Sequence, residues 1–412
     1  MFKKRNGLLL AGLALLVAPL ASCGGGEAEI TLKVWAPTED KAVMEHIIAE
    51  FQKTDAGKNI AFDLKHVKEG DVKTELIKDA EAAADVFAIV DDNLTELVKT
   101  NNILEIQGAF KTAATADNAA WTVDAATRNG KLYGFPQTAD NTYFLWYNKQ
   151  YVSEAQAGKL ETLLAAARTA NLNVNYNIGN SWYGTSVFVA GGVGELSVTP
   201  GVGGAADVQN CNFADPDVVE IVEAAFALKG QYNTEWVGND SLVADMIAAT
   251  PLTAAGVGGS WQFEELRTAL GDNLGAMKLP TINVGGTDEQ LGSFRSAKLV
   301  SIKSNTAHPN EALAFAQFST NFESQKYRFE QRGVGPSNKE AAALDAIDDS
   351  IMLAAIADQL NYGVNQATAV TGGYWAPVAT VGTMIMDQDW GEYVTAQAAL
   401  TAAVAQMNSA SA

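Results

Sequence analysis

Cysteine and histidine are nearly missing from this 412-residue sequence. The only cysteines are Cys23 and Cys211, and the three histidines are His46, His66 and His308. The scarcity of these two residue types argues against a disulfide framework, a cysteine-based metal site and a histidine-dependent catalytic triad. We therefore expect no catalytic residue, no metal and no cofactor, and we expect Cys211 to be a spectator thiol.

Positive charge is also scarce, since 28 Lys and Arg stand against 48 Asp and Glu, for a net charge of −20. A surface this acidic repels phosphate backbones and anionic lipid headgroups, so nucleic acid is not an expected partner. None of the glycine-rich stretches has the spacing of a phosphate-binding loop. Beyond the first residues, no apolar run reaches the roughly 18 residues that a membrane-spanning helix needs.

The first residues have the pattern of an export signal. Three basic residues at 3–5 precede an apolar segment, Gly7–Pro19, and the segment Leu20–Cys23 resembles a bacterial lipobox. This resemblance implies that residues 1–22 are removed and that Cys23 carries lipid, with residues 23–29 as a glycine-rich tether. We expect an exported protein held at the membrane by that anchor, at the cell surface or in the periplasm.

Strand and helix patterns alternate along the rest of the chain. Ile30–Ala36 alternates apolar and polar residues, Glu39–Lys53 has apolar residues at helical spacing, and Asp85–Val90 is a short apolar strand. Farther on, Asp215-Pro216 is a helix-start pair. This alternation predicts an α/β fold with largely parallel strands covered on both faces.

The segment Asn129–Lys149 divides the chain. Its Asn129-Gly130 pair predicts a tight turn, and the apolar run Thr142–Asn148 predicts a strand buried on both faces. Between them, the polar link Gln137–Thr142 is expected to cross from one lobe to another. Two further crossings are expected at 291–302 and 333–338. The predicted lobes are 30–137 plus 295–335, and 138–294 plus 336–412.

Aromatic residues beside glycines or in polar loops are candidates for a cleft, because sugars stack their apolar faces on aromatic rings. Trp182-Tyr183 is expected in a polar loop, Trp261 after a Gly-Gly-Ser run, and Tyr374-Trp375 after a glycine pair. In contrast, we expect core or partly buried positions for three other tryptophans, namely Trp35, Trp146 and Trp236.

Several motifs resemble those of the maltose/maltodextrin-binding proteins, the sugar-binding subunits of ABC importers. N-G-K-L-Y-G-x-P followed by x-Y-N-K resembles the family's first interlobe crossing, and Gly259-Ser260-Trp261 resembles its G-P-W. Leu279-Pro280-Thr281 and the run His308–Glu311 resemble further landmarks. The run Ala84–Asp92 resembles the family's D-x-x-x-x-x-x-D segment. The arginine that follows this segment in the family is Asn93 here, which puts that one sugar contact in question.

The resemblance implies a two-lobe periplasmic-binding-protein-like fold with the ligand between the lobes. The ligand-binding residues it implies are Glu39, Asp40, Lys41, Asp91 or Asp92, Asp140, Trp182, Tyr183, Trp261, Tyr374 and Trp375. It further implies a monomer, not an enzyme, that captures an oligosaccharide of the maltodextrin class and delivers it to the transmembrane subunits of an ABC importer. Two alternatives stay open: a cell-surface glycoside hydrolase, since carboxylates are abundant, and a scaffold or adhesin without a small ligand.

Overall fold

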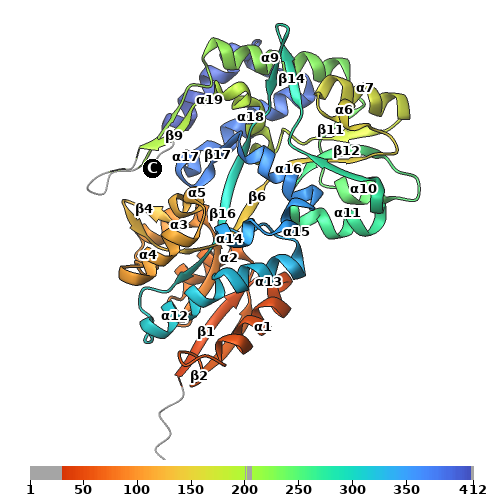
Figure 1. Cartoon of the computed structure of the whole chain (residues 1–412). Helices are drawn as coiled ribbons and strands as arrows, with labels where there is room; N and C mark the ends of the chain where they lie inside the picture. The colour runs from red at the N-terminus through yellow and green to blue at the C-terminus, as the bar shows by residue number, and fades with distance from the viewer. Residues whose placement is uncertain (1–29, 200, 202–206, 410–412) are drawn as a thin grey trace, which may run out of the picture.

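The computed structural model describes residues 30–199, 201 and 207–409, and these form two α/β lobes (Figure 1). The predicted signal segment, Cys23 and the tether lie outside the described residues. Each lobe has its own apolar core. The core of the first lobe draws on residues 32–135 and 297–316, and that of the second on residues from 143 to 407. The predicted two-lobe α/β fold is therefore confirmed.

The first lobe is built on a six-stranded sheet with the order β17-β16-β3-β1-β2, and β6 also pairs with β16. Alternation works as expected in β1, where Leu32, Val34 and Ala36 are buried. The strands are β1 (Ile30–Ala36), β2 (Ile60–His66), β3 (Val86–Val90), β6 (Phe135–Thr142), β16 (Ser293–Ile302) and β17 (Gly363–Asn365). The helices that cover the sheet or lead to it are η1 (Thr38–Asp40), α1 (Lys41–Phe51), α2 (Glu69–Lys78), η2 (Asp91–Asn93), α3 (Leu94–Lys99), α4 (Gly108–Asp117), α5 (Ala120–Ala125), α12 (Pro309–Ser319) and α13 (Phe322–Arg332).

The second lobe has a five-stranded sheet with the order β11-β8-β12-β7-β13. Every residue of β7 is buried, as the apolar run predicted. The strands are β7 (Phe144–Asn148), β8 (Asn173–Asn175), β11 (Trp236–Val237), β12 (Thr253–Gly258) and β13 (Leu274–Met277). Its helices are α6 (Glu154–Ala157), α7 (Leu160–Ala170), α8 (Ser181–Phe188), η3 (Ala190–Gly192), α9 (Pro216–Gln231), α10 (Leu242–Ile247), η4 (Ser260–Gln262), α11 (Phe263–Leu270), η5 (Gly271–Asn273), α14 (Lys339–Ala342), α15 (Asp345–Asp348), α16 (Ile351–Leu360), α17 (Gln366–Ala369), η6 (Gly372–Tyr374), α18 (Trp375–Asp387), η7 (Gly391–Tyr393) and α19 (Ala396–Ser409).

Two antiparallel strands, β6 and β16, connect the lobes (Figure 1). Along β16, Phe294 packs in the core of the second lobe, whereas Ala297 and Leu299 pack in the core of the first. A third passage runs beside them, where the amide of Ala139 donates to the carbonyl of Gly335 at 2.8 Å. The strand β7 follows β6 directly and enters the second sheet antiparallel to its neighbours β12 and β13. In the first sheet, β16 is antiparallel to β3. Each sheet is therefore mixed rather than purely parallel.

The crossing itself differs from the prediction. Residues 137–142 were expected to be a polar link, but they belong to the continuous strand β6, and Gln137, Thr138 and Asp140 are buried. The strand itself lies between β16 and the passage at 333–338, so it is an internal segment of the crossing and not an exposed link. Sequence polarity suggested a link because it does not show that segments about 150 to 200 residues away provide the cover.

Local turn chemistry was predicted more successfully. Asn129 and Gly130 both adopt positive φ, 51° and 74°, and join β4 (Thr127–Arg128) to β5 (Lys131–Leu132). Pro216 opens α9, as the Asp-Pro pair predicted. Among the elements that were missed are α4, whose residues are mostly alanine and threonine, β8, which has only three residues, and the buried strand β12, whose glycines suggested a loop.

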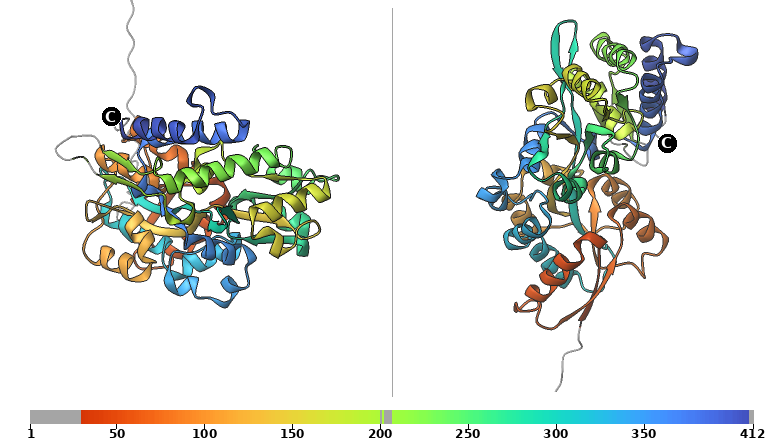
Figure 2. Two further views of the ribbon diagram at one scale, coloured as in Figure 1. Left: turned by 90° about the horizontal axis from the view of Figure 1, so that it is seen from above. Right: turned by 90° about the vertical axis from the view of Figure 1, so that its right-hand side faces the viewer.

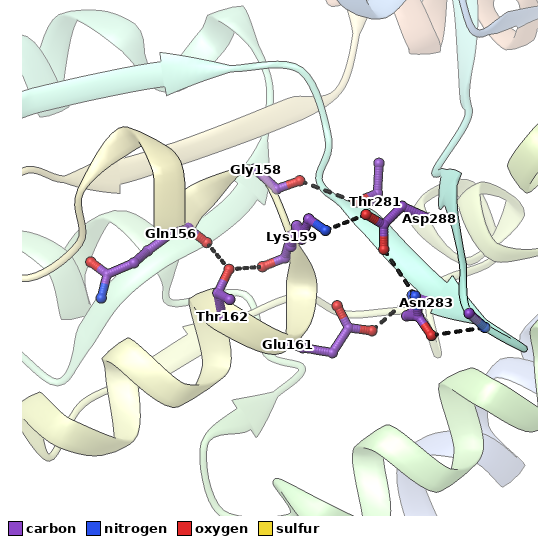
Figure 3. A network of polar contacts seen from close by, with 9 residues as sticks. Gln156, Gly158, Lys159, Glu161, Thr162, Thr281, Asn283 and Asp288 are labelled. Atoms are coloured by element: carbon purple, nitrogen blue, oxygen red, sulfur yellow. Dashed lines mark hydrogen bonds and ion pairs between the residues drawn. The ribbon is translucent and has the colours of Figure 1, made fainter.

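Two small hairpins extend from the second lobe: β9 (Leu196–Thr199) with β10 (Val208–Cys211), and β14 (Thr281–Val284) with β15 (Thr287–Gln290). The β14–β15 hairpin projects at the end of the molecule (Figures 1 and 2). Figure 3 shows this hairpin tied to α7 and the turn before it, where Lys159 pairs with Asp288 and Glu161 accepts from the Asn283 backbone amide at 2.8 Å. None of the helices formed by the described residues combines the length and apolar character that crossing a membrane requires.

Candidate functional site

A cavity of about 520 Å³ lies between the lobes, within the size range of small-ligand sites. Its wall in the first lobe consists of Lys73, Asp92, Asn93, Thr95, Glu96 and Lys99, and its wall in the second lobe consists of Val198, Asp207, Gln366, Ala367, Val370, Thr371, Gly372, Gly373 and Trp375. The η2 turn enters this wall because it directly follows the carboxyl end of β3, the usual place of ligands in α/β sheets. Asp92 and Trp375, both predicted from sequence, meet here across the interface.

Asp91 and Asp92 are separated by the geometry of η2. Asp91 points into the first lobe, where Ser296 Oγ donates to it at 2.6 Å and the Ala297 amide at 2.9 Å. Burial raises the pKa of Asp91 to about 7, despite these hydrogen bonds. Asp91 therefore ties η2 to β16, and Asp92 is the residue of the pair that lines the cavity.

Asp92 remains accessible to solvent inside the cleft, but atoms of both lobes surround it. This desolvation raises the pKa of Asp92, while the nearby cations Lys73 and Arg128 act in the opposite direction. Its Oδ2 accepts a hydrogen bond from Gln366 Nε2 at 3.1 Å. A carboxylate placed this way can accept hydrogen bonds from hydroxyl groups of a ligand.

An arginine that sequence reasoning missed reaches the same turn. Arg128, on β4, donates to the carbonyl of Asp91 at 3.0 Å and to the carbonyl of Ala367 in α17 at 3.3 Å. Burial lowers the pKa of Arg128, and the charges of Asp91 and Asp92 act against that shift. Asn93 stands where the family resemblance expects an arginine, so Arg128 supplies positive charge from a distant hairpin. No local motif marks it.

Aromatic side chains cluster in the second lobe. Of the predicted residues, Trp182, Tyr183 and Trp261 do not line the cavity, but Trp182 reaches its wall through a hydrogen bond to Gln366. The Trp182 ring lies 5.7 Å from Trp261 and 4.6 Å from Tyr143, and Tyr183 lies 5.3 Å from Tyr143. Trp261 is 54% exposed, which leaves a ring face free for a ligand. The prediction that Trp182 and Tyr183 lie in a loop is wrong, because they lie in the first turn of α8, capped by Asn180.

Tyr374 and Trp375 also separate. Tyr374 is fully buried, shares a hydrogen bond of 2.8 Å with Thr185, and packs near Phe294, so it belongs to the core of the second lobe. Burial raises the pKa of Tyr374 well above its ordinary value. Trp375 is half-buried and lines the cavity. Of the three tryptophans predicted to be core or partly buried, Trp146 and Trp236 are fully buried and Trp35 is half-buried, as expected.

The predicted acidic-lysine segment is engaged within the first lobe. Asp40 is buried between Arg328, whose Nε donates at 3.0 Å, and Arg332. Burial alone would raise the pKa of Asp40, but the two guanidinium groups outweigh it and hold this pKa below its ordinary value. Glu39 is exposed, and exposed Lys41 lies 4.0 Å from Glu45. None of the three predicted residues lines the cavity described above.

Asp140 was expected to be an exposed carboxylate at the cleft mouth, and this is wrong, since it is only 1% exposed. Its Oδ1 has no hydrogen-bond partner among the described residues. Lys298, on the neighbouring strand β16, pairs with Glu69 at 3.0 Å. Burial acts to lower the pKa of Lys298, but the Glu69 and Asp140 carboxylates outweigh it and raise this pKa. Asp140 is therefore part of a buried polar layer under the crossing.

Metal binding has no support in the residues that the structure describes, where no group of three or more His, Cys, Asp or Glu side chains is arranged to hold an ion. Cys211 lies at the end of β10, half-buried and unbonded to any other described cysteine. Burial raises the pKa of its thiol, which lowers its reactivity.

Solved structures with the same architecture include maltodextrin-binding proteins and a structure determined with acarbose. One determined with acarbose is 25% identical, with a TM-score of 0.78 over 92% of this chain and 99% of its own. The maltodextrin-binding protein MalE1 from L. casei BL23 is 19% identical, with a TM-score of 0.79 over 93% of this chain and 100% of its own. A cyclo/maltodextrin-binding protein complexed with maltotetraose is 22% identical, with a TM-score of 0.75 over 93% and 97%.

The sequence comparisons are narrower. No curated protein matches the chain. A sequence model described as bacterial extracellular solute-binding protein matches residues 46–355, which is most of the described chain. The predicted family and its two-lobe fold are confirmed by this match and by the solved structures, whose titles name binding proteins rather than enzymes. The chain belongs to the bacterial extracellular solute-binding proteins.

Proposed function

We propose that this protein captures an oligosaccharide of the maltodextrin class between its lobes and delivers it to an ABC importer. The observation that carries this proposal is the cavity that places the Asp92 carboxylate of the first lobe opposite the Trp375 ring of the second. Hydroxyl groups of a sugar bind to carboxylates, and its apolar faces stack on aromatic rings. The exposed ring of Trp261 beside Trp182 extends the aromatic surface.

Capture involves closure of the two lobes about the crossings. The strands β6 and β16 and the passage at 333–338 are the connections about which a rigid-body rotation can occur. A ligand that touches both walls of the cavity binds the closed form better than the open form, and this difference in affinity drives closure.

The membrane anchor and the importer complete the proposal. The lipobox-like segment Leu20–Cys23 supports lipid attachment at Cys23, which would keep the binding protein near the importer. The family resemblance supports the transmembrane subunits of an ABC importer as the partner, with the binding protein as a monomer.

Isothermal calorimetry against maltose, maltotriose, maltotetraose and unrelated oligosaccharides tests the proposal. We expect one site per chain, a preference for α-linked glucose oligomers and a ligand-dependent rise in the melting temperature. Silence against the whole panel would contradict sugar capture and favour a scaffold. Release of reducing sugar from maltodextrins would instead indicate a glycoside hydrolase.

A further inference from the structure

Gln366, the first residue of α17, joins the two walls of the cavity through its side-chain amide. Its Oε1 accepts from the indole Nε1 of Trp182 at 2.8 Å, and its Nε2 donates to Oδ2 of Asp92 at 3.1 Å. The residue is only 5% exposed, so both ends of the amide are held in a largely dry environment.

The chemistry of the two partners determines the orientation of this amide. An indole N–H can only donate, so the amide oxygen must face Trp182. An ionised carboxylate can only accept, so the amide nitrogen must face Asp92. An amide in the reverse orientation would place donor against donor and acceptor against acceptor, and glutamate in place of Gln366 would set two carboxylates together.

The two hydrogen bonds of Gln366 depend differently on lobe closure. Trp182 lies in the second lobe. Gln366 lies on the same side, because Val364 and Val370 on either side of it pack against the second-lobe core, although β17 joins the edge of the first sheet. Their bond therefore orients the amide whether or not the lobes close. Asp92 belongs to the first lobe, so its bond to Gln366 requires the lobes to meet. The neighbouring contact from Arg128 to the carbonyl of Ala367, at 3.3 Å, crosses the interface at the same place.

We propose that Gln366 is a positioning residue that couples lobe closure to ligand binding, by orienting Asp92 against the cavity only when the lobes meet. This inference rests on the proposed function, in that the cavity is where the ligand binds. In the open form Asp92 is free to rotate in water, and closure brings its Oδ2 to the amide held by Trp182. The remaining acceptor capacity of Asp92 then faces the cavity in one fixed orientation, which lowers the ordering cost of binding.

A four-variant cycle tests the coupling in the ligand-free protein, with small-angle X-ray scattering as the measure of lobe closure. Gln366→Glu removes the donor and should shift the population toward an open, more extended form. Asp92→Asn keeps an acceptor for Gln366 and should stay as compact as the wild type. The double variant Asp92→Asn with Gln366→Glu exchanges donor and acceptor, and should recover most of the compactness that Gln366→Glu loses.

Ligand affinity is measured in parallel with maltotetraose. We expect Gln366→Glu to raise the dissociation constant at least tenfold. The double variant is compared by scattering alone, because Asp92→Asn also removes the carboxylate that would bind sugar hydroxyls. Gln359→Glu is the matched control, because this buried glutamine bonds to Leu279, Leu291 and Ser293 and does not touch the cavity. It should lower the melting temperature without changing the open population.

The scattering arm decides the role of Gln366 independently of the sugar. A wild type as extended as Gln366→Glu, or a double variant no more compact than Gln366→Glu, would overturn the inference. The scattering cycle could behave as expected while the wild type binds neither maltotetraose nor the other sugars. That result would contradict the proposed ligand class but would retain the role of the Gln366–Asp92 hydrogen bond in lobe closure.

Discussion

Lys99 of α3 and Asp207, just before β10, form an ion pair of 2.7 Å that crosses from the first lobe to the second. Both residues line the interlobe cavity, so the pair closes one side of its mouth. Asp207 is 16% exposed and Lys99 is 54% exposed, and a pair this accessible is worth no more than about 1 kcal/mol and is weakened by salt.

Lys99→Ala is therefore expected to weaken binding of maltodextrins by up to about fivefold, because it removes an attraction present only in the closed form. The effect should shrink as ionic strength rises, and calorimetry at low and high salt measures it. Lys53→Ala is the control, since it removes an exposed pair with Glu50 that stays within the first lobe. Equal effects of the two substitutions would contradict a role across the cleft.

Trp261→Ala and Trp375→Ala should each weaken sugar binding by about 1–3 kcal/mol through loss of stacking area. Because Trp261 is 54% exposed, its loss should leave the melting temperature of the ligand-free protein nearly unchanged. Trp390→Ala is the matched control, since this ring stacks on Phe226 at 4.5 Å, outside the described cavity. It should lower stability and leave affinity unchanged; collapse of the folded state in Trp261→Ala would instead indicate a core role.

Asp140→Ala is expected to reduce the stability of the ligand-free protein, by about 1–3 kcal/mol, because it removes a buried carboxylate near Lys298. This differs from the small effect that an exposed loop position would predict. Asp140→Asn should cost less, since it keeps an acceptor. Chemical unfolding without ligand measures the cost. Calorimetry then tests whether the sugar dissociation constant also rises, by roughly 10- to 100-fold for alanine, if Asp140 contacts ligand.

Asp91 should make stability depend on pH. Its pKa in the folded protein is about 7 against an ordinary 3.8, so the folded state holds a proton that the unfolded state has lost between these values. The contribution is fully present below about pH 3.8 and is lost as pH rises through about 7. Relative to Asp91→Asn, the wild-type free energy of unfolding should fall by up to about 1.4 kcal/mol per pH unit in that window. A difference that stays constant with pH would contradict this ionisation.

Cys23→Ser should release the protein from membranes without changing its sugar affinity, because the lipobox-like segment would lose its acceptor for lipid. Cell fractionation with calorimetry on the released protein checks both halves of the expectation. Cys211→Ser is the control thiol, and it should leave the distribution unchanged. A Cys23→Ser protein that is still processed and still sediments with membranes would argue against lipid at this position.

Local features of this protein were determined by short stretches of sequence. The alternation in β1, the start of α9 at Pro216 and the turn at Asn129-Gly130 were all predictable, because period and backbone preference depend on a few adjacent residues. The family, too, could be recognised from motif order along the chain. These signals were sufficient to predict two α/β lobes with a cleft between them.

Which member of each motif lines the cleft was decided only by the tertiary structure. Successive residues of a turn point in different directions, so Asp91 enters the core while Asp92 lines the cavity, and likewise Tyr374 is buried while Trp375 lines the wall. The strand β6 is polar, so its sequence suggested an exposed link. The tertiary structure instead places it between β16 and the passage at 333–338.

The contacts across the cleft lie farthest from any sequence signal. Gln366 meets Asp92 from 274 positions away, and Arg128 meets Ala367 from 239 positions away. Neither residue has a local pattern that marks it, because its role depends on a partner brought close by the packing of two lobes. Sequence period determines which elements form, whereas side-chain partners across an interface exist only once those elements have been placed against each other.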